Sequence, residues 1–330
     1  MLDLSHVRSL TVFGKWRSFF IADNMRFLRV LDLEDTSELE DHHLVQIGQL
    51  HHLKYLSLRG CREISCLPNS LWNLRHLETL DVRGTGIYEL PTTITNLRKL
   101  QHLRGECLFL RPQVLDACLN KYDIFNLCRF SKERPENIVL PRGIGKLKAL
   151  RTLGVIAVFR GNGKATLREL RELTQLCKLR VDGVSGESSK VFWSAIAGHS
   201  QLQSLSVKLK DMYDERDQLD GCLGEGLLPP SNLESLTLFG RLVNVTEWIH
   251  KLQNLSKLVL LFSRLEQDDA IQAIGFLPNL AVLRLDDFSF MGTELHFKSS
   301  SFPNLMVLQL YWLDNLQSVL FDKDTMPMLE

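Results

Sequence analysis

The apolar residues of this chain follow one recurring pattern, in which leucine or valine occupies the first, fourth and sixth positions of a short segment. Twelve copies of this Leu-x-x-Leu-x-Leu pattern, one of them degenerate at Leu100, begin at Val7, Leu28, Leu53, Leu77, Leu100, Leu150, Leu176, Leu202, Leu233, Leu255, Leu280 and Leu305. Most copies start 21 to 26 residues after the previous one, and the exceptions are a step of 50 residues after Leu100 and one of 31 after Leu202. Each copy predicts a short strand whose apolar side chains share one side.

A period of this length is that of the leucine-rich repeat. In the fourth copy, Leu77, Leu80 and Val82 are expected to point inward from the strand, and Ile87 and Leu90 to return on the opposite side. One such unit leaves apolar faces in water, and stacking on a neighbour gains about 1.5–3 kcal/mol for each large aliphatic side chain that it buries. The chain is therefore predicted to be an α/β fold, a leucine-rich-repeat solenoid of about twelve irregular repeats, coiled right-handedly with parallel strands on its concave face.

The spacer residues carry two further signals. Thr36, Cys61 and Thr85 stand where such repeats place a small polar residue to satisfy the backbone groups of a turn. A Leu-Pro step follows on the return side, where the missing proline N–H removes no bond between strands. These steps begin at Leu67, Leu90 and Leu140.

We take residues 1–330 as one leucine-rich-repeat domain with two departures from the period. Residues 104–138 match no repeat and are expected to form an ordered insertion, because they contain many apolar residues. Residues 211–230 are acidic and rich in Gly and Pro, and they predict a surface loop that is either functional or disordered. Both ends of the chain fall inside a repeat, so the domain is expected to be truncated at both ends.

Composition limits the class of protein. The chain has 39 basic and 39 acidic side chains, and this balance argues against a protein that coats nucleic acid. No apolar run approaches the length of about 18 residues that a membrane span needs, and no secretory leader is visible. Seven cysteines scattered over 330 residues do not form a disulfide framework, so a reducing, cytoplasmic setting is expected.

The search for chemistry yields no catalytic site and no cofactor. Gly163-Lys164 is followed by Ala165, so the segment RGNGKATLREL lacks the Ser or Thr of a phosphate-binding loop. The paired histidines of DHHLVQIGQLHHL do not match zinc-ligand spacing and are expected on the surface. No cysteine or serine has an evident base and orienting partner, so we expect no enzyme.

Two arginines are candidates for contacting a partner. Arg59 and Arg83 occupy equivalent positions in neighbouring repeats, about 5 Å apart at the backbone, and like charges at this distance favour an acidic partner surface. The equivalent positions on either side are Glu34 and Glu106, and Asp81 neighbours Arg104, so mixed pairing across strands explains the same arginines without a partner.

The second group of candidates is apolar and lies in the C-terminal half. Phe239, Leu261 and Tyr311 should project from the strands, with Phe262 and Trp312 beside them. Aromatic residues in register along one face are typical of a protein interface. The alternative is that some of them cover the edge of the solenoid, or that Trp312 fills the core of the next repeat.

These repeats resemble those of a known family. The segments LRVLDLED, LKYLSLRGCREISCLPNSLWNLRHLETLDVRGTGIYELP and LPRGIGKLKALRTLGV resemble the leucine-rich-repeat region of plant intracellular immune receptors, most closely the coiled-coil type of NLR found in cereals. The resemblance covers essentially the whole chain and is most specific over residues 27–104 and 138–183. It implies repeats that restrain a nucleotide-binding module until a pathogen effector or a host protein under guard is recognised. The family's phosphate loop and Met-His-Asp motif lie upstream of its repeats and do not occur in this sequence, so the resemblance implies no bound nucleotide.

The sequence therefore predicts a protein-recognition module in plant defence, with protein partners and no nucleic acid, membrane span or cofactor. The alternative is a leucine-rich-repeat scaffold or adaptor that binds small GTPases or ubiquitin-ligase substrates. Repeats of that kind are more regular than those of this chain, with its steps of 31 and 50 residues.

Overall fold

A computed structural model describes residues 6–18, 21, 25–105, 138–158, 163–211, 217–224, 226–266 and 268–329. The chain divides into two compact units, which we call unit 1 (Met1–Asn162) and unit 2 (Gly163–Glu330). Most of the predicted insertion, residues 106–137, lies outside the described residues, as do residues 212–216 of the predicted acidic loop.

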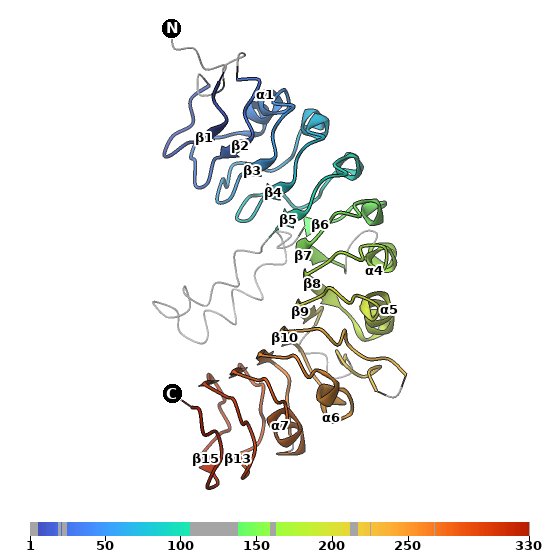
Figure 1. The fold of residues 1–330 in the computed structure, drawn as a ribbon, viewed down its shortest axis with the longest axis vertical. Coiled ribbons are helices and arrows are strands. Elements are labelled where there is room, and N and C mark those ends of the chain that lie inside the picture. The colour runs from blue at the N-terminus through green and yellow to red at the C-terminus, as the bar shows by residue number, and fades with distance from the viewer. Residues whose placement is uncertain are drawn as a thin grey trace. The chain divides into compact units, whose positions relative to one another are not determined.

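All twelve copies of the leucine pattern form strands, and each strand begins two residues after the first leucine or valine of its copy. In unit 1 (Figure 1) these strands are β1 (Ser9–Thr11), β2 (Val30–Asp32), β3 (Tyr55–Ser57), β4 (Thr79–Asp81), β5 (His102–Arg104) and β7 (Thr152–Ala157). In unit 2 they are β8 (Lys178–Val184), β9 (Ser204–Leu209), β10 (Ser235–Phe239), β11 (Lys257–Leu261), β12 (Val282–Asp286) and β14 (Val307–Leu310). The predicted strand positions are confirmed.

Within each unit the strands are parallel and follow one another in sequence order. The fourth-position leucine of one repeat lies directly beside that of the next, as Leu31 does beside Leu56, and Leu236 beside Leu258. These side chains are at most 1% exposed. Parallel neighbours a fixed distance apart, with one column of leucines beneath them, make each unit a leucine-rich-repeat solenoid.

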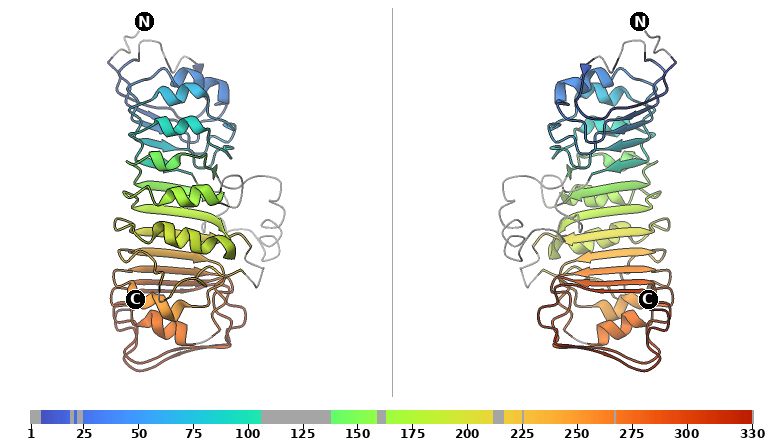
Figure 2. Two further views of the ribbon diagram at one scale, coloured as in Figure 1. Left: turned by 90° about the vertical axis from the view of Figure 1, so that its right-hand side faces the viewer. Right: turned by 90° about the vertical axis from the view of Figure 1, so that its left-hand side faces the viewer.

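The return segments lie on the side opposite the strands within each unit (Figure 2). In unit 1 they are mainly short 3₁₀ turns, and those over Asn69–Asn73 and Thr92–Asn96 each follow a proline of a Leu-Pro step. Proline fixes φ and needs no hydrogen-bond acceptor, so it suits the residue before such a turn. Among its described residues, unit 1 also has helical segments over Asp41–His43, α1 (Leu44–Ile47) and Ile144–Lys146.

Unit 2 uses α-helices for most of its return segments. Its helices are α4 (Gly163–Leu170), α5 (Gly186–Ile196), α6 (Val245–Trp248), a 3₁₀ turn over Ile249–Lys251 and α7 (Asp268–Gly275). Ser185 is the N-cap residue of α5, and its side chain and that of Ser188 form a capping box. Phe192 and Trp193 of this helix are fully buried, so the amphipathic helix closes its repeat from the side opposite the strands.

The small polar residues act in the turns as predicted. The Thr36 hydroxyl donates to the carbonyl of Val12 at 3.3 Å, and the Cys61 thiol donates to the carbonyl of Leu33 at 3.0 Å. Both bonds join one repeat to the repeat before it. Thr85 donates instead to the carbonyl of Val82, in its own turn, at 2.7 Å. Burial raises the pKa of the Cys61 thiol to about 11, so this cysteine is a hydrogen-bond donor and not a nucleophile.

Three short strands were not predicted. Strand β6 (Ile138–Val139) pairs with β7, and β13 (Glu294–Phe297) pairs with β15 (Ser318–Phe321) in a separate two-stranded sheet of unit 2. The leucine pattern did not indicate them because they lie outside its register.

Part of the acidic segment 211–230 also differs from the expectation of a surface loop. Leu219 and Asp220 are fully buried, and Leu223 is 2% exposed. The backbone N–H of Leu219 donates to Arg241 O at 2.9 Å, and its carbonyl accepts from Trp193 Nε1 at 2.8 Å. Residues 219–223 therefore pack into the repeat stack, because two leucines and a capping carboxylate outweigh the polar composition around them.

Candidate protein-interaction surface

The turn after the strands requires an unusual backbone at one repeat position. Counting the first leucine as position one, the residue at position eight has a positive φ in nine of the eleven repeats in which it is described. These nine residues are Gly14, Asp35, Gly60, Gly84, Gly183, Gly240, Phe262, Asp287 and Trp312. Most repeats thus adopt a positive φ here, whereas Ala157 and Leu209 occupy the same position without one.

Phe262 and Trp312 are the exceptions among these residues in chemical type. Glycine adopts a positive φ without penalty, and aspartate tolerates it comparatively well. For a bulky side chain the left-handed region costs about 1–2 kcal/mol. Phe262 has φ +52° and Trp312 has φ +46°. An aromatic residue kept at a position suited to glycine points to a role other than stability.

Three phenylalanines of unit 2 contact one another across neighbouring repeats. The ring centroids of Phe239 and Phe262 are 5.3 Å apart and stacked, and those of Phe262 and Phe288 are 5.8 Å apart. Phe288 also has a positive φ of +51°. All three rings are partly exposed. They form a continuous apolar strip at the carboxyl ends of β10 to β12.

Tyr311 and Trp312 continue this strip at the end of β14. They are 41% and 40% exposed. The backbone N–H of Phe288 donates to the Trp312 carbonyl at 3.4 Å, which links the two groups. We call Phe239, Phe262, Phe288, Tyr311 and Trp312 the aromatic cluster.

Two cations lie over rings of this cluster. Lys208 Nζ is 5.3 Å from the centroid of Phe239, and Arg284 Cζ is 4.7 Å from that of Tyr311. Each cation also pairs with a carboxylate: Lys208 with Asp182 at 3.9 Å, and Arg284 Nε with Asp286 Oδ2 at 2.8 Å. Because each cation is held by both a ring and a carboxylate, its position is well defined.

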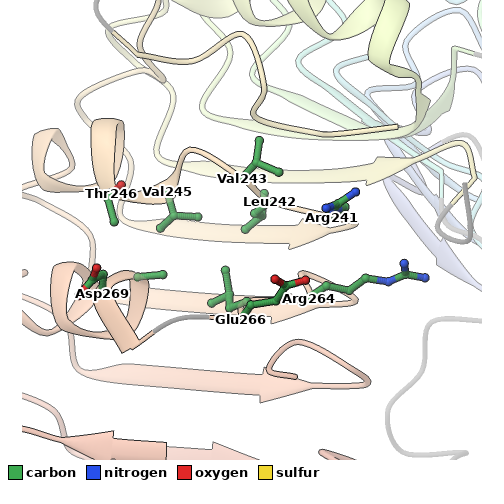
Figure 3. A pocket seen from close by; sticks show the side chains of 10 residues that line it. Arg241, Leu242, Val243, Val245, Thr246, Arg264, Glu266 and Asp269 are labelled. Carbon is green, nitrogen blue, oxygen red and sulfur yellow. The ribbon is translucent and has the colours of Figure 1, made fainter. Parts of the chain in front are cut away.

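A small pocket of about 220 Å³ lies beside the strand ends of β10 and β11. Arg241 and Arg264 extend toward one end of it, and Asp269 of α7 lies at the other (Figure 3). Its floor includes Val243 and Val245. Since its rim mixes both signs of charge, we assign it no ligand.

In unit 1, the predicted arginines are paired with acidic side chains. Arg59 Nη1 lies 2.7 Å from Glu34 Oε1, and Arg83 contacts Asp81 through Nη2 at 2.6 Å and Nε at 2.9 Å. Arg104 lies 3.8 Å from the same Asp81, which is 1% exposed. Ion pairs therefore occupy both arginines: Arg59 pairs with an acid of the preceding repeat, and Arg83 pairs more completely with Asp81, two residues earlier in its own repeat.

The structure brings together the five predicted aromatic-region residues, since Leu261 lies half-buried on β11 directly beside Phe239. Sequence reasoning missed Phe288, because Asp287 and Phe288 both have positive φ and shift the ring one position beyond the pattern. It also missed Lys208 and Arg284. The signal for these cations was a basic residue on the outward face of a strand, next to an aromatic residue of the following repeat.

Within the described ranges, no cluster of three His, Cys, Asp or Glu side chains is arranged to hold a metal ion. In the same part of the chain, each helix is too short or too polar to cross a bilayer.

Comparison with known proteins gives a consistent result. The model of the family described as leucine-rich repeat region matches residues 6–119 and 123–330. Disease resistance protein Pik-2 of Oryza sativa is 32% identical over 291 residues, covering 84% of this chain and 28% of that protein. Disease resistance protein RGA4 of the same species is 30% identical over 317 residues, covering 93% of this chain and 29% of that protein.

The chain thus spans less than a third of the length of these relatives. Among solved structures, a leucine-rich-repeat protein of Leptospira interrogans aligns with a TM-score of 0.52 at 16% identity, covering 99% of this chain and 83% of that one. This likeness concerns the fold alone.

Proposed function

Because this chain belongs to the family of leucine-rich-repeat regions, we propose that it is the protein-recognition region of a plant intracellular immune receptor. It senses a pathogen effector, or a host protein that the effector alters, and its role is binding rather than catalysis. Similarity to the rice disease resistance proteins supports the link to defence.

The aromatic cluster is the observation that carries the recognition role. Its five rings gather over neighbouring repeats, and Phe262 and Trp312 stand at a position that seven of the nine other described repeats fill with glycine or aspartate. Tyrosine, tryptophan and arginine are the residues that most often dominate binding energy at interfaces. In this proposal the effector or host protein contacts Phe239, Leu261, Phe262, Tyr311 and Trp312, together with Phe288 and Arg284.

Restraint of a nucleotide-binding module is the second part of the proposal, and it is assigned to unit 1. Arg59 is the better candidate contact, because its side chain is 34% exposed and bound to the exposed Glu34. Arg83 neutralises the buried Asp81, so its replacement would disturb folding as well as binding.

The first test is the coding sequence that precedes Met1 in the gene. A nucleotide-binding module encoded there supports the proposal, and an F-box or an unrelated domain contradicts it.

In the full receptor, Arg59→Glu should raise resting cell-death activity in leaves, because it places a second negative charge beside Glu34 at the restraining contact. The matched control is Lys54→Glu, which makes the same change of charge in the exposed Lys54–Glu78 pair of the same unit. Equal resting activity of both variants and wild type rejects the restraint.

A further inference from the structure

The strand faces of the two units differ in charge. The main-sheet strands of unit 2 carry five cations (Lys178, Arg180, Lys208, Lys257 and Arg284) and two acids (Asp182 and Asp286), a balance of +3. The strands of unit 1 carry one cation (Arg104) and two acids (Asp32 and Asp81), a balance of −1. The shorter strands of unit 1 end before the position that carries Asp182, Lys208 and Asp286 in unit 2. When the described charged residues at that position (Glu34, Arg59 and Arg83) are included, the balance of unit 1 is 0, which still differs from +3.

The two acids of the unit 2 strand face lie beneath its cations. The side chains of Lys208 and Arg284 are 26% and 23% exposed, whereas those of Asp182 and Asp286 are 12% and 2% exposed. These ammonium and guanidinium groups are therefore more accessible to a partner than the two carboxylates that they pair with, and Asp287, next to Phe288, is also partly exposed.

We propose that the aromatic cluster and the basic strand face of unit 2 together bind an acidic segment of the partner protein that also carries apolar side chains. This inference rests on the proposed recognition function and names the chemistry of its partner. The apolar side chains pack on Phe239, Phe262 and Phe288, and the carboxylates pair with Lys208, Arg284 and the exposed Lys178 and Lys257.

Phe262 and Trp312 are the residues that determine this binding. Both hold a positive-φ backbone conformation that is unfavourable for an aromatic residue but costs nothing for glycine at the same position, as in Gly60 and Gly84. If their only role were structural, replacement by glycine would relieve the backbone and change little else. If they bind, the same replacement keeps the fold and removes the contact.

The test uses the complete 330-residue chain, immobilised, and a random peptide library as the probe. Wild type is expected to select peptides rich in Asp and Glu together with Leu, Phe or Trp. Synthetic copies of the selected peptides should bind the Phe262→Gly/Trp312→Gly variant roughly thirtyfold more weakly, as expected for the loss of an interface hot spot. Thermal unfolding of this variant should have a midpoint equal to or above that of wild type. The matched control, Phe13→Ala, removes an 84% exposed ring of unit 1 and should leave binding unchanged.

Charge is tested with Lys178→Glu/Lys257→Glu. This variant should bind the same peptides about tenfold more weakly, and its affinity should depend less on salt than that of wild type. Selection of basic peptides, or acidic peptides whose affinity neither double variant changes, overturns the inference and leaves the recognition function standing on another surface. Both the inference and the recognition function are overturned if the chain selects no peptide and every surface variant of the full receptor still responds to the effector.

Discussion

Units 1 and 2 are built on the same leucine register but differ in almost everything placed around it. Strands of unit 1 are two to six residues long and mostly three, with 3₁₀ turns after a Leu-Pro step as their return segments. Main-sheet strands of unit 2 are four to seven residues long, and three of the six (β8, β10 and β11) are followed by an α-helix. The register alone therefore sets the stacking of repeats, whereas the spacer sets how much strand and helix each repeat contains.

Both units use a carboxylate to join successive repeats, and the two carboxylates differ in burial. In unit 1, Asp41 accepts hydrogen bonds from Ser65 N at 2.9 Å, Ser65 Oγ at 2.7 Å and Cys66 N at 3.2 Å, near the surface. In unit 2, the fully buried Asp220 accepts from Val243 N at 2.7 Å, Asn244 N at 3.1 Å and Trp248 Nε1 at 3.0 Å. A carboxylate that accepts three hydrogen bonds thus joins successive repeats in both units, near the surface in unit 1 and buried in unit 2.

The largest predicted difference between the units comes from removing these carboxylates. Asp220→Ala leaves three donors without their acceptor, among them the buried Trp248 Nε1, and should lower the free energy of unfolding by about 3 kcal/mol. Asp41→Ala should lower it by only about 1 kcal/mol, because water can reach the donors that it leaves. Urea unfolding of the full chain measures both. Asp217→Ala, which removes one exposed hydrogen bond to Gly186 N, is the control, and equal losses for all three variants would contradict the comparison.

The glycines at position eight of the repeat give a smaller difference. A Cβ added to Gly240 of unit 2 would lie 2.4 Å from Leu209 Cδ1, whereas one added to Gly14 of unit 1 would meet no atom within 4 Å. Gly14→Ala should therefore cost about 1 kcal/mol, the backbone penalty alone. Gly240→Ala should cost about 2 kcal/mol or more, because Leu209 must also move. The thermal unfolding midpoints rank the two variants. A larger loss of stability for Gly14→Ala than for Gly240→Ala would contradict the prediction that both incur the same backbone penalty and that only Gly240→Ala adds a clash.

The smallest predicted effect is a pH dependence of opposite sign in the two units. Burial opposes ionisation of Asp41, but hydrogen bonds from Ser65 and Cys66 outweigh it and hold the pKa of this carboxyl below its ordinary value. Burial raises the pKa of Asp220 above its ordinary value, with the hydrogen bonds from Val243, Trp248 and Asn244 acting against it.

The sign of each contribution follows from these directions. Asp41 stabilises the fold above its unfolded-state pKa, and this contribution is lost as the pH falls through its lower folded-state pKa. The contribution of Asp220 is complete below its unfolded-state pKa and is lost as the pH rises through its higher folded-state pKa. Relative to wild type, Asp41→Asn should thus be most destabilised near neutral pH, and Asp220→Asn should become more destabilised toward acid. Urea unfolding between about pH 4 and pH 7 tests this, and slopes of the same sign would reject it.

Sequence reasoning located the repeats well because it used the one feature under strict geometric control. Leu56 and Leu236 must lie beneath a strand for their repeats to stack, so their spacing could be read directly. The burial of Asp220 could not be read, because its three donors come from residues 23 to 28 positions further along the chain. The place of Phe288 in the aromatic cluster was equally hidden, since it depends on two successive positive φ values.

The sequence by itself determined which side chains form the columns of the core and where each strand begins, because an aliphatic side chain is buried only when its neighbour carries another at the same repeat position. Only the tertiary structure decided which of the remaining side chains meet. Lys208 and Phe239 come together from different repeats, as do Arg284 and Tyr311, and their contacts arise from the lateral register of strands that no single repeat encodes.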